Sequence, residues 1–261
     1  MKLQCRLAEA AEDNRRRRHT DPQIAKARCK GHISIVMTIA QTVPQSNFTE
    51  PEFRVRAVAA LHQGPSDRIF DPRTGRAWAR SDWDLNPEML ADFEVMEPAR
   101  AAAVLVPVVA RSELTVLLTE RTAHLSTHAG QIAFPGGKVE PFDADPVHTA
   151  LREAEEEIGL MRSLVEPLGF LDGYRTGTGF LVTPVVALVK PDFTLTLDSG
   201  EVASAFEVPL AFLMDPENHK RHSRDWRGRQ RHYYAMPFGD RYIWGATAGM
   251  LKNLQEGLYP R

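Results

Sequence analysis

Cysteine is scarce in this chain: only two of its 261 residues are cysteines, Cys5 and Cys29. Both precede the region in which regular structure is expected, so a disulfide between them would cross-link little. Their spacing matches no metal-binding pattern. We therefore expect neither a disulfide scaffold nor a cysteine-ligated metal, and we expect a reducing, cytoplasmic setting.

Long apolar runs and a strong net charge are also lacking. No apolar stretch approaches the about 20 residues that span a bilayer, and no apolar segment of a secretory signal follows the charged N-terminus. The 32 basic and 34 acidic side chains leave a formal charge of −2, which gives no field to gather nucleic acid or an anionic membrane. We expect neither as a partner, and we interpret the four arginines at 15–18 as part of a solvated tail.

The chain is long enough for one domain with an extension. Residues 1–50 predict a disordered N-terminal extension, because they are polar and poor in apolar periodicity. Residues 51–98, with Trp78 and Trp83, predict a helical and irregular lead-in, and residues 99–261 predict the folded domain. Met37 offers a second translation start, so we expect residues 1–36 to be missing from natively expressed protein, although the sequence leaves Met1 and Met37 both open.

The apolar pattern predicts an α/β domain. Strands are expected at 101–110, interrupted at Pro107, and at 115–119, 131–134, 165–171 and 181–189. A hairpin is expected from 232–236 and 241–244 around Gly239 and Asp240. Helical segments are expected at 208–213, at 247–258 and at 51–63, where the apolar residues are Phe53, Val55, Val58, Ala59 and Leu61. Mixed strands with helices on both faces give a three-layer α/β/α sandwich.

A further helix is predicted between Asp145, a capping residue followed by Pro146, and Gly159. Apolar residues recur along it at three- and four-residue steps: Val147, Ala150, Leu151, Ala154 and Ile158. The charged residues on it that matter for chemistry are Arg152, Glu153, Glu156 and Glu157. Clustered carboxylates repel one another, and a hard divalent cation with oxygen ligands would neutralise them. For an isolated run of glutamates, a merely solvated face is the alternative.

The residues around these glutamates favour the metal site. Gly137 is followed after five residues by Asp143, and after eight more by R-E-A-x-E-E-x-G-L. This pattern resembles the Nudix box, the signature of the Nudix hydrolase superfamily, and implies a Nudix-type α/β/α sandwich with a mixed sheet in residues 99–261. It departs from the common form twice, since Asp143 stands where Glu is usual and one extra residue precedes Arg152. One branch of the superfamily shares both departures.

That branch is indicated by the residues just upstream. Residues 117–121 (L-L-T-E-R), Gly130 and residues 134–137 (F-P-G-G) resemble the second motif of coenzyme A pyrophosphatases. Residues 243–248 (I-W-G-A-T-A) resemble the closing segment of the branch. Ser126 departs from the pattern, because an arginine is often found at that position. The resemblance covers about residues 101–258.

The resemblance implies a metal site and its support. Mg²⁺, or Mn²⁺ in its place, would be held by Glu153, Glu157 and Glu156, with help from the backbone carbonyl near Gly137. Arg152 would hold a box carboxylate in place by charge-assisted hydrogen bonds rather than contact the substrate. A surface ion pair within the helix is the alternative for Arg152.

The remaining roles concern the base and the substrate. The general base is one of the box glutamates or a carboxylate from a later loop, for which Glu201 is the candidate. Arg121 and Lys138 are the cations best placed to meet phosphates, and His128 is a third candidate contact. A solvated Lys138 and a structurally hydrogen-bonded His128 remain open alternatives.

The sequence thus predicts a metal-dependent enzyme with a small-molecule substrate. The resemblance implies hydrolysis of the pyrophosphate bond of coenzyme A or acyl-coenzyme A, giving 3′,5′-ADP and (acyl-)4′-phosphopantetheine. A Nudix hydrolase of ADP-ribose, a dinucleotide or another nucleoside diphosphate derivative is the alternative. A non-catalytic nucleotide-binding module that regulates a partner is a third. The oligomeric state stays open, with a homodimer among the options.

Overall fold

The computed structural model describes residues 48–65, 80–81, 83–88, 99–124, 129–226 and 228–260. Every described residue belongs to one compact unit, Ser46–Arg261. The domain boundaries expected at residues 50 and 98 remain predictions. Several sequence predictions fall outside the described ranges, namely those for Cys5, Cys29, the arginines at 15–18, Met37, Trp78, Ser126 and His128.

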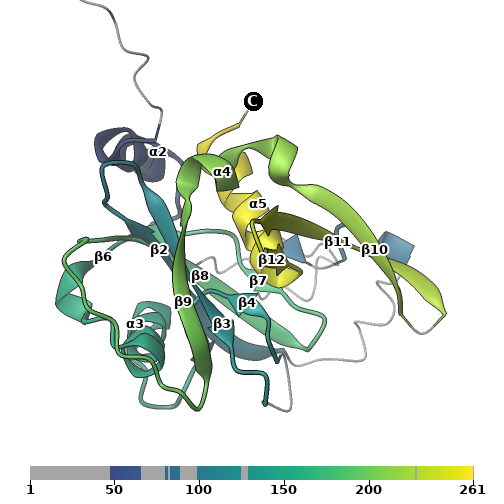
Figure 1. Cartoon of the computed structure of the whole chain (residues 1–261), viewed down its shortest axis with the longest axis horizontal. Coiled ribbons are helices and arrows are strands. Elements are labelled where there is room, and N and C mark those ends of the chain that lie inside the picture. Colours follow the sequence, from purple (N-terminus) through teal and green to yellow (C-terminus); the bar gives the residue numbers. More distant parts are fainter. Residues whose placement is uncertain are drawn as a thin grey trace, which may run out of the picture. The chain divides into compact units, whose positions relative to one another are not determined.

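The described residues form a mixed sheet of nine strands (Figure 1). The strands are β1 (Arg80–Ser81), β2 (Arg100–Val109), β3 (Thr115–Arg121), β4 (Ile132–Ala133), β5 (Gly136–Lys138), β6 (Val165–Phe170), β7 (Tyr174–Arg175), β8 (Phe180–Val189) and β9 (Val202–Pro209). Six of them follow the order β1-β7-β8-β2-β3-β4, while β5 pairs with β2, β6 with β8 and β9 with β3. The long strands β2 and β8 are parallel, and β3, β5, β6 and β9 each run antiparallel to their partners.

β2 and β8 lie at the buried centre of the sheet because both are nearly continuous runs of apolar residues. The predicted interruption at Pro107 is wrong: β2 continues through it, with Pro107 beside Ala187 of β8. The Leu105 amide donates to the Pro135 carbonyl, on the side of β2 away from β8. Pro107 has its nitrogen on that same side, between the stretches where β2 pairs with β5 and with β3. The proline therefore removes no ladder hydrogen bond.

Helices cover both faces of the sheet, as the apolar pattern predicted. α3 (Pro146–Ile158) packs on one face, where its Ala154 and Ile158 are buried with Leu105 of β2. α2 (Glu50–Ala60) and α5 (Ala246–Leu258) pack on the other face. Figure 1 looks along the sheet, with α3 on its left and α5 on its right. None of the described helices is long and apolar enough to cross a membrane.

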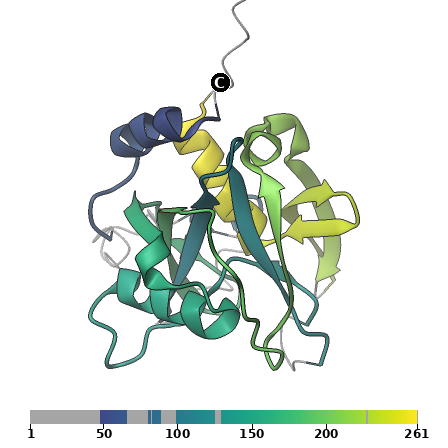
Figure 2. The same cartoon turned by 60° about the vertical axis from the view of Figure 1, so that its left-hand side comes forward.

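A second, three-stranded antiparallel sheet packs beside α5 (Figure 2). It consists of β10 (Lys220–Trp226), β11 (Arg229–Phe238) and β12 (Arg241–Trp244). The predicted hairpin around Gly239 and Asp240 is confirmed as the β11–β12 connection. Met236 and Ile243 are the buried residues on the inner face of this sheet. The structure also describes α4 (Leu210–Met214) and two short 3₁₀ turns, Arg162–Leu164 and Pro216–Asn218.

The lead-in to the sheet is only partly as predicted. The predicted helix is confirmed as α2, and its Phe53 is fully buried, whereas the apolar residues Val55 and Val58 are 69% and 76% exposed. Residues three or four apart share a helix face, which makes Phe53 and Ala57 the buried pair instead. Trp83 of the irregular segment is buried with its ring edge toward Trp226, the two centroids lying 6.2 Å apart.

Candidate active site

The site is built on the turn and helix that the sequence singled out. α3 begins after Asp145, whose carboxylate accepts a hydrogen bond from the His148 amide at 2.8 Å. It ends at Gly159, which takes the left-handed conformation at φ 69°. Before the helix, Gly136 has φ 155° and lies against the backbone of β2, where a β-carbon would overlap Ala103. The start and end of α3 and the close approach of Gly136 to β2 together determine which side chains of the helix face the glycine turn.

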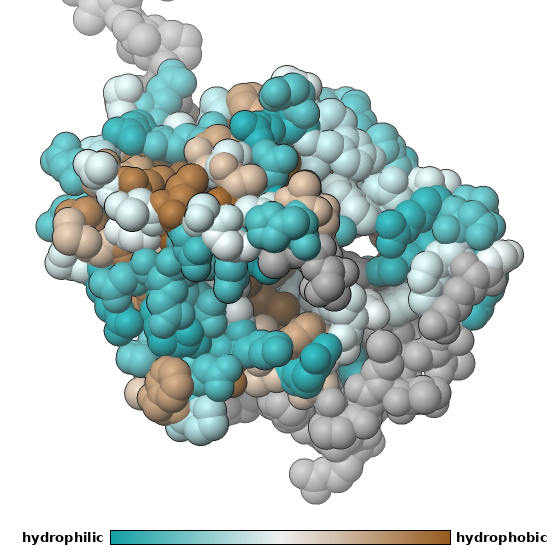
Figure 3. Space-filling model, turned by 60° about the horizontal axis from the view of Figure 1, so that its bottom comes forward, coloured by the Kyte–Doolittle hydropathy of each residue, from teal (hydrophilic) through white to brown (hydrophobic). Residues whose placement is uncertain are grey.

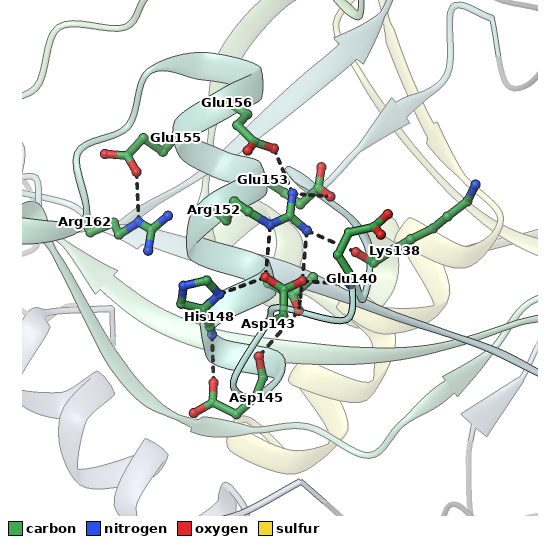
Figure 4. A network of polar contacts seen from close by, with 11 residues as sticks. Lys138, Glu140, Asp143, Asp145, His148, Arg152, Glu153, Glu155, Glu156 and Arg162 are labelled. Carbon is green, nitrogen blue, oxygen red and sulfur yellow. Dashed lines mark hydrogen bonds and ion pairs between the residues drawn. The ribbon is translucent and has the colours of Figure 1, made fainter.

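Arg152 is the centre of a hydrogen-bond network that connects the segment at 138–145 to α3 (Figure 4). Its Nε and Nη2 donate to the two carboxylate oxygens of Asp143, each at 3.0 Å. Its Nη1 donates to Glu156 at 2.8 Å and lies 2.9 Å from Glu153 Oε1. Its Nη2 also donates to the Lys138 carbonyl at 3.2 Å. Arg152 is buried, so the structure fits a support for carboxylates better than the alternative of a surface ion pair.

Asp143 anchors the other end of this network. Its side chain is fully buried and accepts hydrogen bonds from His148 Nδ1 at 2.8 Å, from Thr149 Oγ1 at 2.9 Å and from the Glu140 amide at 2.9 Å. The Arg152 guanidinium holds the pKa of the Asp143 carboxyl well below its usual range. The other three donors also lower this pKa. Asp143 therefore stays charged, which keeps Arg152 in place.

Glu157 is the most deeply buried of the box glutamates, with 4% of its surface exposed. Its Oε2 accepts a hydrogen bond from the Gly136 amide at 3.2 Å, and its Oε1 lies 3.6 Å from Arg121 Nη1. Burial raises the pKa of Glu157 to about 7, because this one amide and one distant guanidinium only partly replace the lost water. The site thus holds a carboxylate whose negative charge is incompletely compensated.

Glu153 lies between the glycine turn and Arg152. Burial is the main reason that the pKa of Glu153 is raised, and the Arg152 charge opposes the shift. A β-carbon on Gly137 would overlap the Glu153 carboxylate, so only glycine lets the turn approach this side chain. Glu156, by contrast, has a side chain that is 59% exposed and points outward, held by Arg152.

We expect Gly137→Ala to displace the Glu153 carboxylate, because the added methyl group would occupy its position. Turnover should fall by about 100-fold while the fold persists, since misplacing a reacting group by about 1 Å has an effect of that size. Steady-state kinetics and circular dichroism on the variant would measure both effects. Gly257→Ala on α5, where a β-carbon meets nothing within 4 Å, is the control. Full activity in Gly137→Ala would contradict the contact.

The sheet brings two further predicted residues to the same place. Arg121, at the end of β3, lies near Glu157 and also places its Nη2 at 3.9 Å from Glu201 Oε2. The Glu201 backbone is fixed by the Thr122 amide, which donates to its carbonyl at 2.9 Å. The negative charge of Glu201 also helps to raise the pKa values of Glu153 and Glu157, so the three carboxylates are neighbours.

Two other candidates are not gathered in this way. The Lys138 side chain is exposed and extends away from the Arg152 network, while its carbonyl joins that network. His128 lies outside the described residues. The sequence reasoning missed the Gly136 amide as a donor to Glu157, although the paired glycines before the box were the signal for a close backbone approach.

Hydrophilic side chains surround a hollow on the face seen in Figure 3, which is the lower side of Figure 1. The loops at 139–145 and 198–201, which flank the box, reach this side of the molecule. The Glu156 and Glu201 side chains of the candidate site are 59% and 50% exposed, so a polar ligand can reach them from solvent.

The carboxylates fit a hard divalent ion by their chemistry. Within the described ranges, no three His, Cys, Asp or Glu side chains converge closely enough to form a metal-binding group as they stand. Glu153 and Glu157 nevertheless both have raised pKa values caused mainly by burial, which an ion with oxygen ligands would reverse. Glu156 adds an exposed carboxylate beside them.

Proton and metal should compete at Glu157. Its pKa is about 7 in the folded chain against an ordinary 4.5, so its contribution to stability is fully present below about pH 4.5 and is lost as pH rises through 7. The slope between these values is about 1.4 kcal/mol per pH unit. We expect Mg²⁺ or Mn²⁺ to raise the melting temperature more at pH 8 than at pH 5.5, measured against EDTA. Equal shifts at both values, or the same difference in Glu157→Gln, would contradict the competition.

Known sequences are similar to this chain over much of its length. The family model described as the NUDIX domain matches residues 99–228. The uncharacterized Nudix hydrolase NudL of Escherichia coli strain K12 is 38% identical over 183 residues, which are 66% of this chain and 95% of that protein. NudL of Shigella boydii serotype 18 matches to the same extent, 38% over 183 residues with 66% and 95% coverage.

Solved structures are similar at lower identity. The NUDIX domain of Shewanella oneidensis NrtR, complexed with ADP ribose, is 18% identical with a TM-score of 0.41, covering 66% of this chain and 97% of that one. A binary complex of Caenorhabditis elegans Ap4A hydrolase is 21% identical with a TM-score of 0.37, covering 42% and 80%. No conclusion about ligand follows from likenesses of this size. On the family match and the near-complete coverage of NudL, the chain belongs to the Nudix hydrolases, enzymes that act on the phosphoric anhydride of pyrophosphate-bearing substrates.

Proposed function

We propose that this enzyme hydrolyses the pyrophosphate bond of coenzyme A or acyl-coenzyme A with the help of Mg²⁺ or Mn²⁺. The observation that supports the chemistry is the buried pair of Glu153 and Glu157 against the Gly136–Gly137 turn, with incompletely compensated negative charge. The substrate is supported by the sequence motif at 117–121, 130 and 134–137 and by the closing segment at 243–248.

The box glutamates would hold the ion. Glu153 and Glu157 supply the buried carboxylates, Glu156 the exposed one, and the carbonyl near Gly137 a neutral oxygen. A bound divalent ion supplies neutralisation of phosphate oxygens and a water of lowered pKa. Arg152 orients Glu153 and Glu156 and leaves the substrate to other residues.

The surrounding residues would then do the rest of the work on the substrate. Glu201, half exposed and near Glu153 and Glu157, is placed to accept a proton from the attacking water. Arg121 would bind a phosphate oxygen when a ligand draws it away from its long contact with Glu157. Lys138 and His128 are proposed as further phosphate contacts.

Water would add its oxygen to one phosphorus while the bridging P–O–P bond breaks. The bridging oxygen leaves on the other phosphate, so the products are 3′,5′-ADP and 4′-phosphopantetheine, with any acyl group retained on the latter. The proton lost by the water passes to the base. No group other than water is consumed, which keeps the reaction a hydrolysis.

Two other functions deserve a test. Ser126, at a position where the coenzyme A branch often carries an arginine, favours another nucleoside diphosphate derivative such as ADP-ribose or a dinucleotide. A non-catalytic nucleotide-binding module is opposed by the presence of all three box glutamates, Glu153, Glu156 and Glu157.

Product analysis separates these alternatives. Purified full-length protein is incubated with coenzyme A, ADP-ribose or NADH, each with Mg²⁺ or Mn²⁺, and with EDTA as the control. We expect 3′,5′-ADP from coenzyme A, identified by mass, and no product with EDTA, because the ion neutralises the pyrophosphate. Turnover of ADP-ribose or NADH alone would reject coenzyme A as the substrate. Turnover of none would favour the regulatory module.

A further inference from the structure

The pairing of β3 with β9 changes register at the edge of the candidate site. Glu120 pairs with Ser204, whereas the next residue, Arg121, pairs with Val202. One residue of β9, Ala203, is therefore extra. Such a bulge bends the strand and changes the direction of the side chains beside it. Here it lies at the residue that points toward Glu157.

The contacts of the Arg121 side chain do not fix its position by themselves. Its guanidinium nitrogens lie 3.6 Å from Glu157 and 3.9 Å from Glu201. A direct charge-assisted hydrogen bond is shorter, about 2.7–2.9 Å. The place of the guanidinium therefore depends on where the backbone of residues 120–122 is held.

That backbone is held from behind by a residue of the second sheet. Arg241 of β12 donates through Nη1 to the Glu120 carboxylate and, at 3.2 Å, to Ser204 Oγ. Ser204 Oγ donates to the same carboxylate oxygen at 3.0 Å. The Arg241 guanidinium also lies 4.4 Å from the centroid of the Phe206 ring on β9. These contacts hold Glu120 and Ser204, the two residues that pair with each other just before the bulge.

We propose that Arg241, Glu120 and Ser204 form a latch that positions Arg121 in the active site. Neighbouring residues of a strand point to opposite faces, so the latch lies behind Arg121 and acts on it through the backbone. Arg241 is thus a positioning residue, contributed by a hairpin that lies outside the box. The latch rests on the proposed function only in that Arg121 is taken to bind substrate.

The same strand pair carries a matched control at its far end. Arg111 Nη2 lies 2.7 Å from Glu207 Oε1, Thr115 Oγ1 donates to the Glu207 carboxylate, and the Arg111 guanidinium lies 5.4 Å from the Phe193 ring. The two arginine side chains are similarly exposed, 40% for Arg111 and 29% for Arg241. Only the Arg241 group adjoins the bulge.

Hydrogen exchange tests the hold on the backbone without any substrate. In the wild type, the Arg121 amide donates to Gln131 at 3.0 Å and the Thr122 amide to Glu201 at 2.9 Å. We expect Arg241→Met to speed exchange of these two amides by about tenfold, because their local opening becomes easier. Arg111→Met should leave them unchanged. Unchanged exchange in Arg241→Met, or equal acceleration in both variants, would overturn the latch.

A kinetic cycle tests the positioning. With coenzyme A and Mg²⁺, we expect Arg241→Met to lower kcat/KM by about 10- to 100-fold, and Arg111→Met by less than about twofold. In an Arg121→Gln background, Arg241→Met should change kcat/KM by less than about twofold, since no guanidinium is left to position, while the two losses of melting temperature still add. Fully additive losses of kcat/KM would overturn the proposal.

The outcomes also separate the latch from the proposed function. If Arg241→Met folds poorly, Ser204→Ala takes its place in both experiments, because it removes one partner of Glu120 and leaves the arginine. Wild-type turnover in Arg121→Gln would overturn the positioning role while leaving the pyrophosphatase standing. A wild-type enzyme without turnover of coenzyme A would count against the substrate, and the exchange rates would still decide whether the latch holds the bulge.

Discussion

Glu157→Gln is expected to fold normally and to lose at least about 100-fold in turnover, since the proposed ligand of the catalytic ion would be removed. The amide side chain has nearly the shape of the carboxylate and can still accept the hydrogen bond from Gly136. Burial raises the pKa of Glu157 to about 7, so a neutral side chain there suits the metal-free fold. The melting temperature of the variant without metal should therefore be no lower than that of the wild type at pH 8.

The control for this variant lies on the same helix. Glu155 is 47% exposed and forms an ion pair with Arg162 at 2.8 Å, on the outer side of α3. Glu155→Gln should keep wild-type turnover and metal response, because surface ion pairs contribute only about 0–1 kcal/mol. Near wild-type turnover in a folded Glu157→Gln, or an equal loss in Glu155→Gln, would sink the assignment of Glu157 to the ion.

Arg152→Met is expected to cause the largest loss of stability, about 3–5 kcal/mol in the free energy of unfolding. The methionine stem fills the space of the side chain but leaves Asp143 buried without its guanidinium partner. Asp143 has a pKa far below its usual range, so its contribution to stability is present above its ordinary pKa of 3.8 and is lost as pH falls through the lower folded value. The gap between variant and wild type should thus be wide at pH 7 and narrow toward acid.

Urea unfolding at pH 7 and at about pH 2, which lies well inside the range in which the contribution is lost, measures this difference. Arg162→Met is the matched control, because Arg162 also contacts a glutamate of α3 but is 39% exposed. Its effect should stay below about 1 kcal/mol at both values. A loss in Arg152→Met no larger than in Arg162→Met, or one that does not depend on pH, would show that the buried pair with Asp143 matters little.

Elements with strong local signals could be predicted from the sequence, and elements that depend on distant partners could not. The helix from Asp145 to Gly159 was predicted closely because its cap and its left-handed end are properties of single residues. β9, by contrast, has mostly half-buried residues and was missed, since its place in the sheet depends on β3. The sequence could not separate the buried Phe53 from the exposed Val55 and Val58, because apolar character does not say which face of α2 meets the core.

The same limit applies to the candidate site. The glutamates and Arg152 share one helix, so their proximity follows from helical spacing. That Arg121 and Glu201 come within 3.9 Å of each other depends on the register of β3 and β9, including a bulge that no local pattern marks. The Gly136 amide belongs to the backbone, and its role depends on how the turn approaches Glu157.

The fully enclosed Asp143 gives a meaning to the two departures from the common box. Its carboxylate accepts hydrogen bonds from Arg152, His148, Thr149 and the Glu140 amide, so both oxygens of this short side chain are occupied. The shorter acid is accompanied in the sequence by one additional residue before Arg152. The chain between Asp143 and Arg152 is thus long enough for the guanidinium to reach back to both oxygens of this short acid.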